Sequence, residues 1–165
     1  MLLEPATESD NGAGFIDFLG EIDGSGGEYL KMPAGGSRMP ATCETVTKRL
    51  HYVHQDGAQV FKYAVRKMYE VSRDLLERNG FTANDLSVMI PHQANRRIIE
   101  GAASRLGLSP DKVLINIDRY GNTSAASVAI ALDEARKTGA CGKGDWIIMV
   151  AFGSGLTWAG ATVKL

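Results

Sequence analysis

The fold is decided by Trp146-Ile147-Ile148-Met149-Val150-Ala151, which is followed by Phe152 and the tripeptide Gly153-Ser154-Gly155. Six consecutive apolar residues, rich in β-branched side chains and bounded by glycine, predict a buried strand. A second strand is expected over residues 157–165. The connection between them is a short glycine turn, whereas a parallel pair needs a long crossover, so the two strands must be antiparallel.

Upstream of this pair, strand-like and helix-like patterns alternate. Strands are expected at residues 14–22, 86–90 and 113–117, and helices at 60–79, 94–106 and 121–137. A long glycine-rich loop is expected over 23–41, with a short helix near 43–50. Helices between strands imply right-handed crossovers. We therefore expect an α/β fold with a mixed sheet of about five strands, the last one antiparallel, and helices on its faces.

Composition narrows the class of protein. The 165 residues carry a net charge of −1, so there is no basic excess to follow a nucleic-acid backbone. No apolar run approaches the ~18 residues of a membrane span, and the N-terminus shows no signal-peptide pattern. Cys43 and Cys141 lie far apart and form no disulfide framework or paired metal motif, which fits a cytoplasmic protein. His51 and His54 lack the further ligands of a metal shell, so we expect no metal.

Three strand ends carry polar or glycine-rich segments. They are Pro91-His92-Gln93-Ala94-Asn95, Gly121-Asn122-Thr123-Ser124, and Phe152-Gly153-Ser154-Gly155. Ligands of open α/β sheets bind beyond the carboxyl ends of parallel strands, so His92 and Asn122 are expected on one rim, with Asn122 at a helix N-terminus. Two hydrogen-bond donors that converge on a carbonyl oxygen form an oxyanion hole. The alternative reading is a loop histidine and a capping asparagine with structural roles only.

The same three motifs closely resemble 3-oxoacyl-[acyl-carrier-protein] synthase III, a member of the thiolase-like superfamily. The resemblance extends over nearly all of the chain but covers only the second half of that family's two-half architecture. It implies that residues 1–12 are the end of the preceding half and that residues 13–165 form the C-terminal ketoacyl synthase domain. The family's nucleophilic cysteine lies in the first half, so Cys43 and Cys141 are expected to be incidental.

The resemblance also implies a reaction and roles for individual residues. The family condenses malonyl-acyl-carrier protein with a cysteine-bound acyl group taken from acyl-coenzyme A, in fatty acid synthesis and without a further cofactor. By resemblance, His92 and Asn122 would hold the malonyl thioester oxygen while carbon dioxide leaves. Phe152 would gate the malonyl carboxylate, and the backbone N–H near Ser154 would complete a second oxyanion hole.

Substrate contacts are implied in the same way. Asn95, Gly57 and Phe61 would line the pantetheine tunnel, and Arg97, with Arg96 beside it, would meet the acidic acyl-carrier protein. For the two arginines the alternative is a solvated helix face. For the chain as a whole the alternatives are a non-catalytic acyl-carrier or pantetheine-binding module, or a malonyl-thioester decarboxylase that needs no cysteine.

Residues 124–132 read Ser-Ala-Ala-Ser-Val-Ala-Ile-Ala-Leu and carry no charge. A helix without a polar face is expected to be buried on all sides. A lone unit would leave one side of it in water as an apolar patch. We therefore expect the surface to be covered by the missing first half or by a second copy of this chain in a homodimer.

Overall fold

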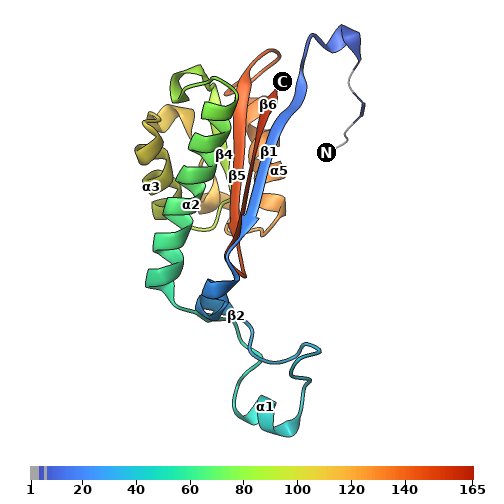
Figure 1. Cartoon of the computed structure of the whole chain (residues 1–165), viewed down its shortest axis with the longest axis vertical. Helices are drawn as coiled ribbons and strands as arrows, with labels where there is room; N and C mark the ends of the chain where they lie inside the picture. Colours follow the sequence, from blue (N-terminus) through green and yellow to red (C-terminus); the bar gives the residue numbers. More distant parts are fainter. Residues whose placement is uncertain (1–3, 6) are drawn as a thin grey trace.

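The computed structural model describes residues 4, 5 and 7–165. A four-stranded sheet in the order β1-β6-β5-β4 forms its centre, with helices on both faces (Figure 1). The strands of this sheet are β1 (Gly14–Ile22), β4 (Val88–Pro91), β5 (Trp146–Gly153) and β6 (Thr157–Lys164). The helices are α1 (Cys43–Thr47), α2 (Gly57–Arg78), α3 (Arg96–Leu106), α4 (Ile117–Tyr120) and α5 (Ala126–Thr138).

The strand directions are those expected from the sequence. β4 pairs with β5 in parallel, whereas β6 is antiparallel to both β5 and β1. The strands β1, β4 and β5 therefore run one way and β6 runs the other. The β5–β6 turn contains Gly155 at φ +74° and Leu156 at φ +50°, and glycine adopts such left-handed backbone without strain.

The expected fifth strand at 113–117 is wrong. Only Val113 forms a single parallel bridge to Met89, after which the Leu114 N–H donates to the Met89 carbonyl at 3.0 Å. The next backbone N–H groups, those of Asn116 and Ile117, donate to the side-chain oxygen of Gln93 at 2.9 and 3.1 Å. Because a side chain takes these donors, the segment turns into α4 instead of extending the sheet.

One face of the sheet, which we call the closed face, lies under α2. Asp56 caps this helix by accepting from the Gln59 N–H at 3.1 Å. One side of the helix is a buried apolar stripe, which consists of Val60, Ala64, Val65, Met68, Val71, Leu75 and Leu76. The stripe packs against α3 and against Ile148, Val150, Phe152 and Trp158 of the sheet. Gly160 of β6 allows the close approach, because a Cβ there would lie 2.8 Å from Leu75 Cδ1.

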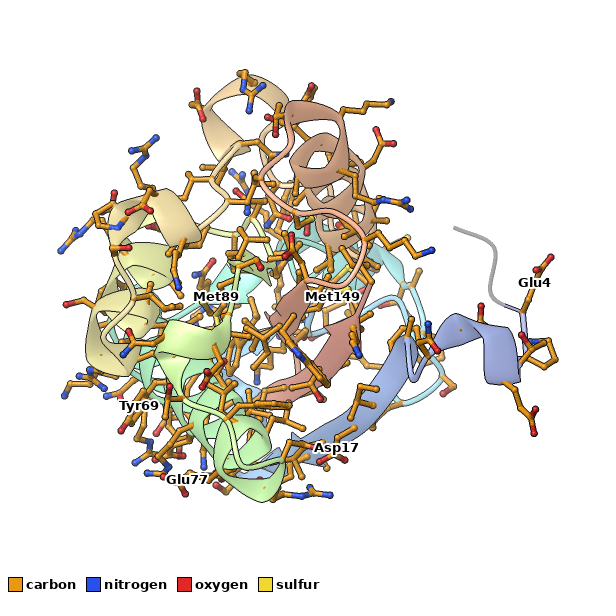
Figure 2. All side chains as sticks on the ribbon, turned by 90° about the horizontal axis from the view of Figure 1, so that it is seen from above. Glu4, Asp17, Tyr69, Glu77, Met89 and Met149 are labelled. Carbon is orange, nitrogen blue, oxygen red and sulfur yellow. The ribbon has the colours of Figure 1, made fainter. Side chains whose placement is uncertain are left out.

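The first strand is also tied to α2. The Asp17 carboxylate of β1 accepts from Arg78 Nη2 at 3.1 Å and from Asn79 Nδ2 at 3.0 Å. Asp17 and Glu77 lie on the same side of the molecule when it is seen from above, whereas Glu4 of the N-terminal segment stands away from the sheet (Figure 2). The expected end of a preceding strand falls largely on residues 1–3 and 6, which lie outside the described residues; residues 8–10 form a 3₁₀ turn.

The opposite face, which we call the open face, lies under α5. This helix packs through Ala131 and Ala135 on residues of β4 and β5, chiefly Val88, Ile90 and Ile147. It stops short of β1, whose outward side chains Phe15, Phe18 and Ile22 are 50%, 65% and 69% exposed. Ala125, Ala126 and Ala129 of the uncharged segment are exposed too. An apolar patch of the expected kind is therefore present.

Residues 32–53 form an arm that extends beyond the end of the sheet and carries α1 at its far end (Figure 1). The two-stranded pair β2 (Leu30–Lys31) and β3 (His54–Gln55) closes its base. The long loop expected over 23–41 thus contains a 3₁₀ helix at Gly24–Tyr29 and the strand β2. The Ser154 hydroxyl donates to the Leu30 carbonyl at 3.0 Å, which joins the base of the arm to the β5–β6 turn.

Candidate active site

A cavity of about 930 Å³ lies beyond the carboxyl ends of β4 and β5 and takes side chains from both faces of the sheet. Val60, Phe61 and Met68 of α2 supply one wall, and Ala125 and Val128 before and within α5 supply another. Seven of the nine residues singled out in the sequence line this one space: Gly57, Phe61, His92, Asn95, Asn122, Phe152 and Ser154. Arg96 and Arg97 lie outside the lining.

His92 is held by backbone on one side and by a side chain on the other. Its N–H donates to the Val150 carbonyl of β5 at 2.7 Å, and its carbonyl accepts from the Ala94 N–H at 3.1 Å. Nδ1 of the ring lies 2.6 Å from the Ser127 hydroxyl oxygen. Partial burial lowers the pKa of His92 below its ordinary value, because the charged form loses hydration. The imidazole is therefore neutral near pH 7.

Asn122 lies in the turn before α5. Its side-chain oxygen accepts from the Ser124 N–H at 3.0 Å, which leaves the side-chain nitrogen without a partner among the described residues. The expected helix start at 121–123 is wrong, because Gly121 and Ser124 have φ of +67° and +53°, which a right-handed helix does not allow. The helix begins at Ala126, so Asn122 precedes its first turn and is exposed at the cavity.

Phe152 and Ser154 close the end of β5. Phe152 is buried and lines the cavity from the closed face. The Ser154 hydroxyl is occupied by its bond to Leu30, whereas the Ser154 backbone N–H has no hydrogen-bond partner among the described residues. A free backbone donor at this position is what an oxyanion hole requires.

The residues expected to contact a long thioester arm and its carrier lie at the start of two helices. Asn95 caps α3 by accepting from the Arg97 N–H at 2.9 Å, and Gly57 is the first residue of α2. The Arg97 guanidinium lies 5.4 Å from the centre of the Phe61 ring, a cation–π contact at the edge of the cavity. Arg97 therefore sits at the cavity's edge although it does not line it.

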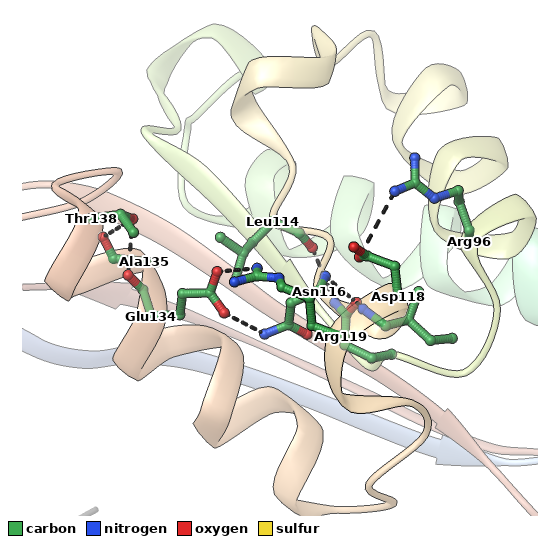
Figure 3. A network of polar contacts seen from close by, with 10 residues as sticks. Arg96, Leu114, Asn116, Asp118, Arg119, Glu134, Ala135 and Thr138 are labelled. Atoms are coloured by element: carbon green, nitrogen blue, oxygen red, sulfur yellow. Dashed lines mark hydrogen bonds and ion pairs between the residues drawn. The ribbon is translucent and has the colours of Figure 1, made fainter.

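Arg96 is placed differently from Arg97. It forms a surface ion pair with Asp118 at 4.0 Å (Figure 3). A second surface ion pair joins it to Glu100 at 3.5 Å. Arg97 has no ion pair among the described residues, which leaves its charge available to an acidic partner. The structure thus separates two neighbouring arginines that the sequence treated alike.

Gln93 is a residue that the sequence analysis missed. Its side chain is 1% exposed, and its nitrogen donates to the Pro91 and Leu114 carbonyls, both at 3.0 Å. Its oxygen accepts the Asn116 and Ile117 N–H groups described above. One buried amide therefore joins the loop that carries His92 to the segment that leads to Asn122. No periodicity marks such a residue, because a glutamine at a strand end usually faces water.

A second polar group supports the same segment from α5. The Glu134 carboxylate accepts from Asn116 Nδ2 at 3.0 Å and pairs with Arg119 (Figure 3). The hydrogen bond from Asn116, and then the one from Arg119, lowers the pKa of Glu134. The carboxylate stays ionised and ties α4 to α5.

Neither cysteine contributes to the cavity. Cys43 is exposed in α1 on the arm, and Cys141 is buried beyond the end of α5, where loss of hydration raises the pKa of its thiol. Within the described part of the chain, no three His, Cys, Asp or Glu side chains gather as metal ligands. No helix among the described residues is both long enough and apolar enough to cross a bilayer.

Comparisons with known proteins agree with the motifs. The family profile described as 3-Oxoacyl-[acyl-carrier-protein (ACP)] synthase III C terminal matches residues 76–165. The chain is 62% identical over 157 residues to the β-ketoacyl-[acyl-carrier-protein] synthase III of Solibacter usitatus, covering 95% of this chain and 47% of that protein. It is 57% identical over 155 residues to the enzyme of that name from Caldanaerobacter subterraneus, covering 94% and 47%. The chain thus spans about half the length of these curated relatives.

Solved structures give the same result. The crystal structure of 3-oxoacyl-[acyl-carrier-protein] synthase III from Aquifex aeolicus superimposes with a TM-score of 0.83 at 38% identity, covering 97% of this chain and 46% of that one. The corresponding protein from Thermus thermophilus gives a TM-score of 0.81 at 39% identity, covering 93% and 47%. The fold is therefore the thiolase-like α/β fold of these enzymes, and the chain belongs to the 3-oxoacyl-[acyl-carrier-protein] synthase III C-terminal family.

Proposed function

We propose that this chain supplies the decarboxylation site of a β-ketoacyl-acyl-carrier-protein synthase III. The observation that carries the proposal is that a neutral His92 and Asn122, whose amide nitrogen has no partner among residues 4, 5 and 7–165, line one cavity at the carboxyl ends of the strands. Both side chains can donate a hydrogen bond from a fixed position to the oxygen of a bound thioester.

The chemistry follows from where charge develops. As the carbon–carbon bond to the malonyl carboxylate breaks, carbon dioxide leaves and the electron pair moves into an enolate whose thioester oxygen becomes negative. Donors aimed at that oxygen bind the transition state better than the neutral carbonyl and so accelerate the step. In the complete reaction the enolate carbon then attacks an acyl group on a cysteine, and the cysteine thiolate leaves.

The substrate is proposed from the shape and charge of the cavity. A pantetheine arm carries a malonyl group on either coenzyme A or an acyl-carrier protein, and the cavity offers Asn95 and Gly57 on one side and Phe61 on another. Arg97 lies beside Phe61 and has no ion pair within the described part of the chain, so it suits an acidic carrier. The reaction needs no cofactor beyond these thioesters.

The condensation itself requires a partner. Neither cysteine of this chain lines the cavity, so the acylated cysteine comes from a first half of the synthase type. Such a half would also cover the exposed apolar residues of the open face. A second copy of this chain is the other surface that could cover the same residues.

The lack of a cysteine in the cavity also favours a narrower activity, the decarboxylation of a malonyl thioester without condensation. Malonyl-thioester decarboxylation needs the two donors and no nucleophile, since the enolate can take a proton from water to give an acetyl thioester. A chain that holds both donors and no cysteine in the cavity is equipped for that step. A binding module without catalysis would keep the tunnel and the carrier surface but would release no carbon dioxide.

The test is carbon dioxide release from malonyl-coenzyme A and malonyl-acyl-carrier protein. The unchanged chain is expected to release it, and His92→Ala or Asn122→Ala to lower the rate about 10²–10³-fold, the usual effect of one oxyanion donor. His54→Ala, in the exposed strand β3, is the matched control. Equal rates in the unchanged chain and both variants would contradict the proposed roles.

A complementation experiment separates the partner from the site. The chain is mixed with the half of the Solibacter usitatus relative that it does not cover, where the resemblance implies the nucleophilic cysteine. Ketoacyl product is measured together with the mass of the complex by light scattering. Product formed only in the mixture supports the split reaction. Product formed by this chain alone would contradict the assignment of the nucleophile to another half.

A further inference from the structure

Ser127 is a buried hydroxyl with two partners at the site. It lies in the first turn of α5 and is 1% exposed. Its oxygen lies 2.6 Å from Nδ1 of His92 and accepts the Gln93 backbone N–H at 3.3 Å. Nothing in the sequence pattern indicates this contact, because Ser127 and His92 lie 35 positions apart.

The positions of the protons follow from counting donors. A serine hydroxyl has one proton to give, and the Gln93 N–H already occupies part of its capacity to accept. Among the described residues, the only other polar atom bonded to this oxygen is Nδ1 of His92. If Nδ1 carried a proton, the Ser127 oxygen would accept twice and its own buried proton would have no acceptor. Buried polar groups are rarely left in that state.

We propose that Ser127 is a positioning residue: by donating its hydroxyl proton to Nδ1, it fixes His92 as the tautomer that carries its proton on Nε2. The proposal rests on the function assigned to His92 above. Nε2 has no hydrogen-bond partner among the described residues, is not sealed from solvent, and belongs to a ring that lines the cavity. The nitrogen that can face a substrate is thus the one with a proton to donate.

The alternative tautomer would defeat the site. With the proton on Nδ1, Nε2 would present a lone pair to the thioester oxygen as that oxygen becomes negative, and the interaction would be repulsive instead of attractive. The first turn of α5 therefore fixes the protonation pattern of His92, while the turn just before it carries Asn122. One short segment thus controls both donors.

The direct test is nitrogen-15 NMR of the imidazole rings in the labelled full chain. The chain has three histidines, and the His92 signals are assigned as those lost in His92→Asn. We expect an unprotonated, hydrogen-bonded Nδ1 and a protonated Nε2 at neutral pH. In Ser127→Ala the Nδ1 signal is expected to shift strongly as its donor disappears. A protonated Nδ1 in the unchanged chain, or an unchanged Nδ1 signal in Ser127→Ala, would overturn the proposal.

Kinetics supply the second readout. In the carbon dioxide assay, Ser127→Ala is expected to lower kcat about 10–100-fold with KM nearly unchanged, the scale of losing alignment at a reacting group. Ser127→Thr, which keeps the hydroxyl, is expected to recover most of the rate. The matched control is Ser72→Ala, since Ser72 is 0% exposed and donates to a helix carbonyl, that of Met68, in α2. A full rate in Ser127→Ala would overturn the positioning role.

The NMR and kinetic results distinguish a failure of the Ser127 proposal from a failure of the proposed function. If the unchanged chain releases no carbon dioxide but the NMR result is as expected, the proposed decarboxylation is wrong and the tautomer assignment stands. If carbon dioxide is released and depends on His92 while Nδ1 carries the proton, the function stands and the role of Ser127 is wrong.

Discussion

On the closed face of the sheet, α2 packs against β5, β6 and β1 and removes the side chains beneath it from water; on the open face, α5 covers β4 and β5 and leaves β1 bare. Leu75, on the closed face, is 0% exposed, whereas Phe18, on the open face, is 65% exposed. Within this chain a helix covers the closed face of the sheet. Part of the open face stays exposed and requires another protein surface to cover it. The cavity lies where the two faces meet, so its wall on the α5 side belongs to the less complete half of the structure.

The difference between the two faces is visible in the sequences of the helices that cover them, α2 and α5. α2 alternates a buried apolar stripe with a charged outer side on which Lys67 pairs with Glu70 at 2.8 Å. The first two turns of α5 have no charged side at all, and charge appears only from Asp133 onward. A helix with one side exposed to water usually carries polar groups on that side. The uncharged first two turns of α5 therefore indicate that another protein surface packs against them.

The largest expected effect is on the free energy of unfolding, when one apolar side chain on each face of the sheet is replaced by alanine. Leu75→Ala removes a fully buried side chain and is expected to lower the free energy of unfolding by about 2–5 kcal/mol. Phe18→Ala removes a larger side chain from the open face and is expected to change it by only about 0.5 kcal/mol. Urea unfolding followed by circular dichroism measures both. Similar losses in the two variants would break the distinction between the faces.

A smaller effect is expected at Gln93, which links the two loops of the site. Gln93→Leu keeps the approximate volume but leaves two carbonyls and two N–H groups without their partner, at a cost of about 1–3 kcal/mol. Hydrogen exchange at the Asn116 and Ile117 amides is expected to accelerate more than exchange in α2. Gln59→Leu, whose side chain has no hydrogen bond among the described residues, is the control. Unchanged exchange at both amides would contradict the link.

The smallest expected effect is a pH dependence at His92. Burial places its folded-state pKa below the unfolded value of about 6.5, so the unfolded chain binds more protons in the interval between them. Its contribution to stability is complete above about pH 6.5 and is lost as the pH falls toward the folded pKa. In urea unfolding from pH 7.5 to 5, His92→Gln is expected to lose less stability than the unchanged chain. Parallel curves for the two proteins would contradict this assignment.

Much of the closed face could be predicted from the sequence because its signals are periodic. The stripe of α2, its end at Asn79-Gly80 and the antiparallel turn at Gly155 each follow from spacing or from one residue with a special backbone. The rim residues were also found, since the crossover rule brings strand ends to one edge. Their placement on one cavity agrees with that expectation, and their catalytic roles stay predictions.

The failures have a common physical cause. The strand expected at 113–117 is replaced because the Gln93 amide takes the donors that a sheet would use, and the helix expected from residue 121 starts later because Ser124 is left-handed. Each of these two differences depends on one side-chain interaction, and a single interaction produces no periodic pattern in the sequence. Ser127 was missed for the same reason, since its importance lies in a partner 35 positions away.

The amide of Gln93 has a mechanical consequence for the two donors. Because one buried group is bonded to the loop of His92 and to the segment that leads to Asn122, we expect a thermal displacement of either one to be transmitted to the other. We therefore expect the imidazole and the carboxamide to fluctuate in phase, so that their separation varies less than the position of either one. A site built in this way preserves the spacing on which recognition of a single oxygen depends, while the His92 N–H bond to Val150 and the Leu114 N–H bond to Met89 anchor both loops to the sheet.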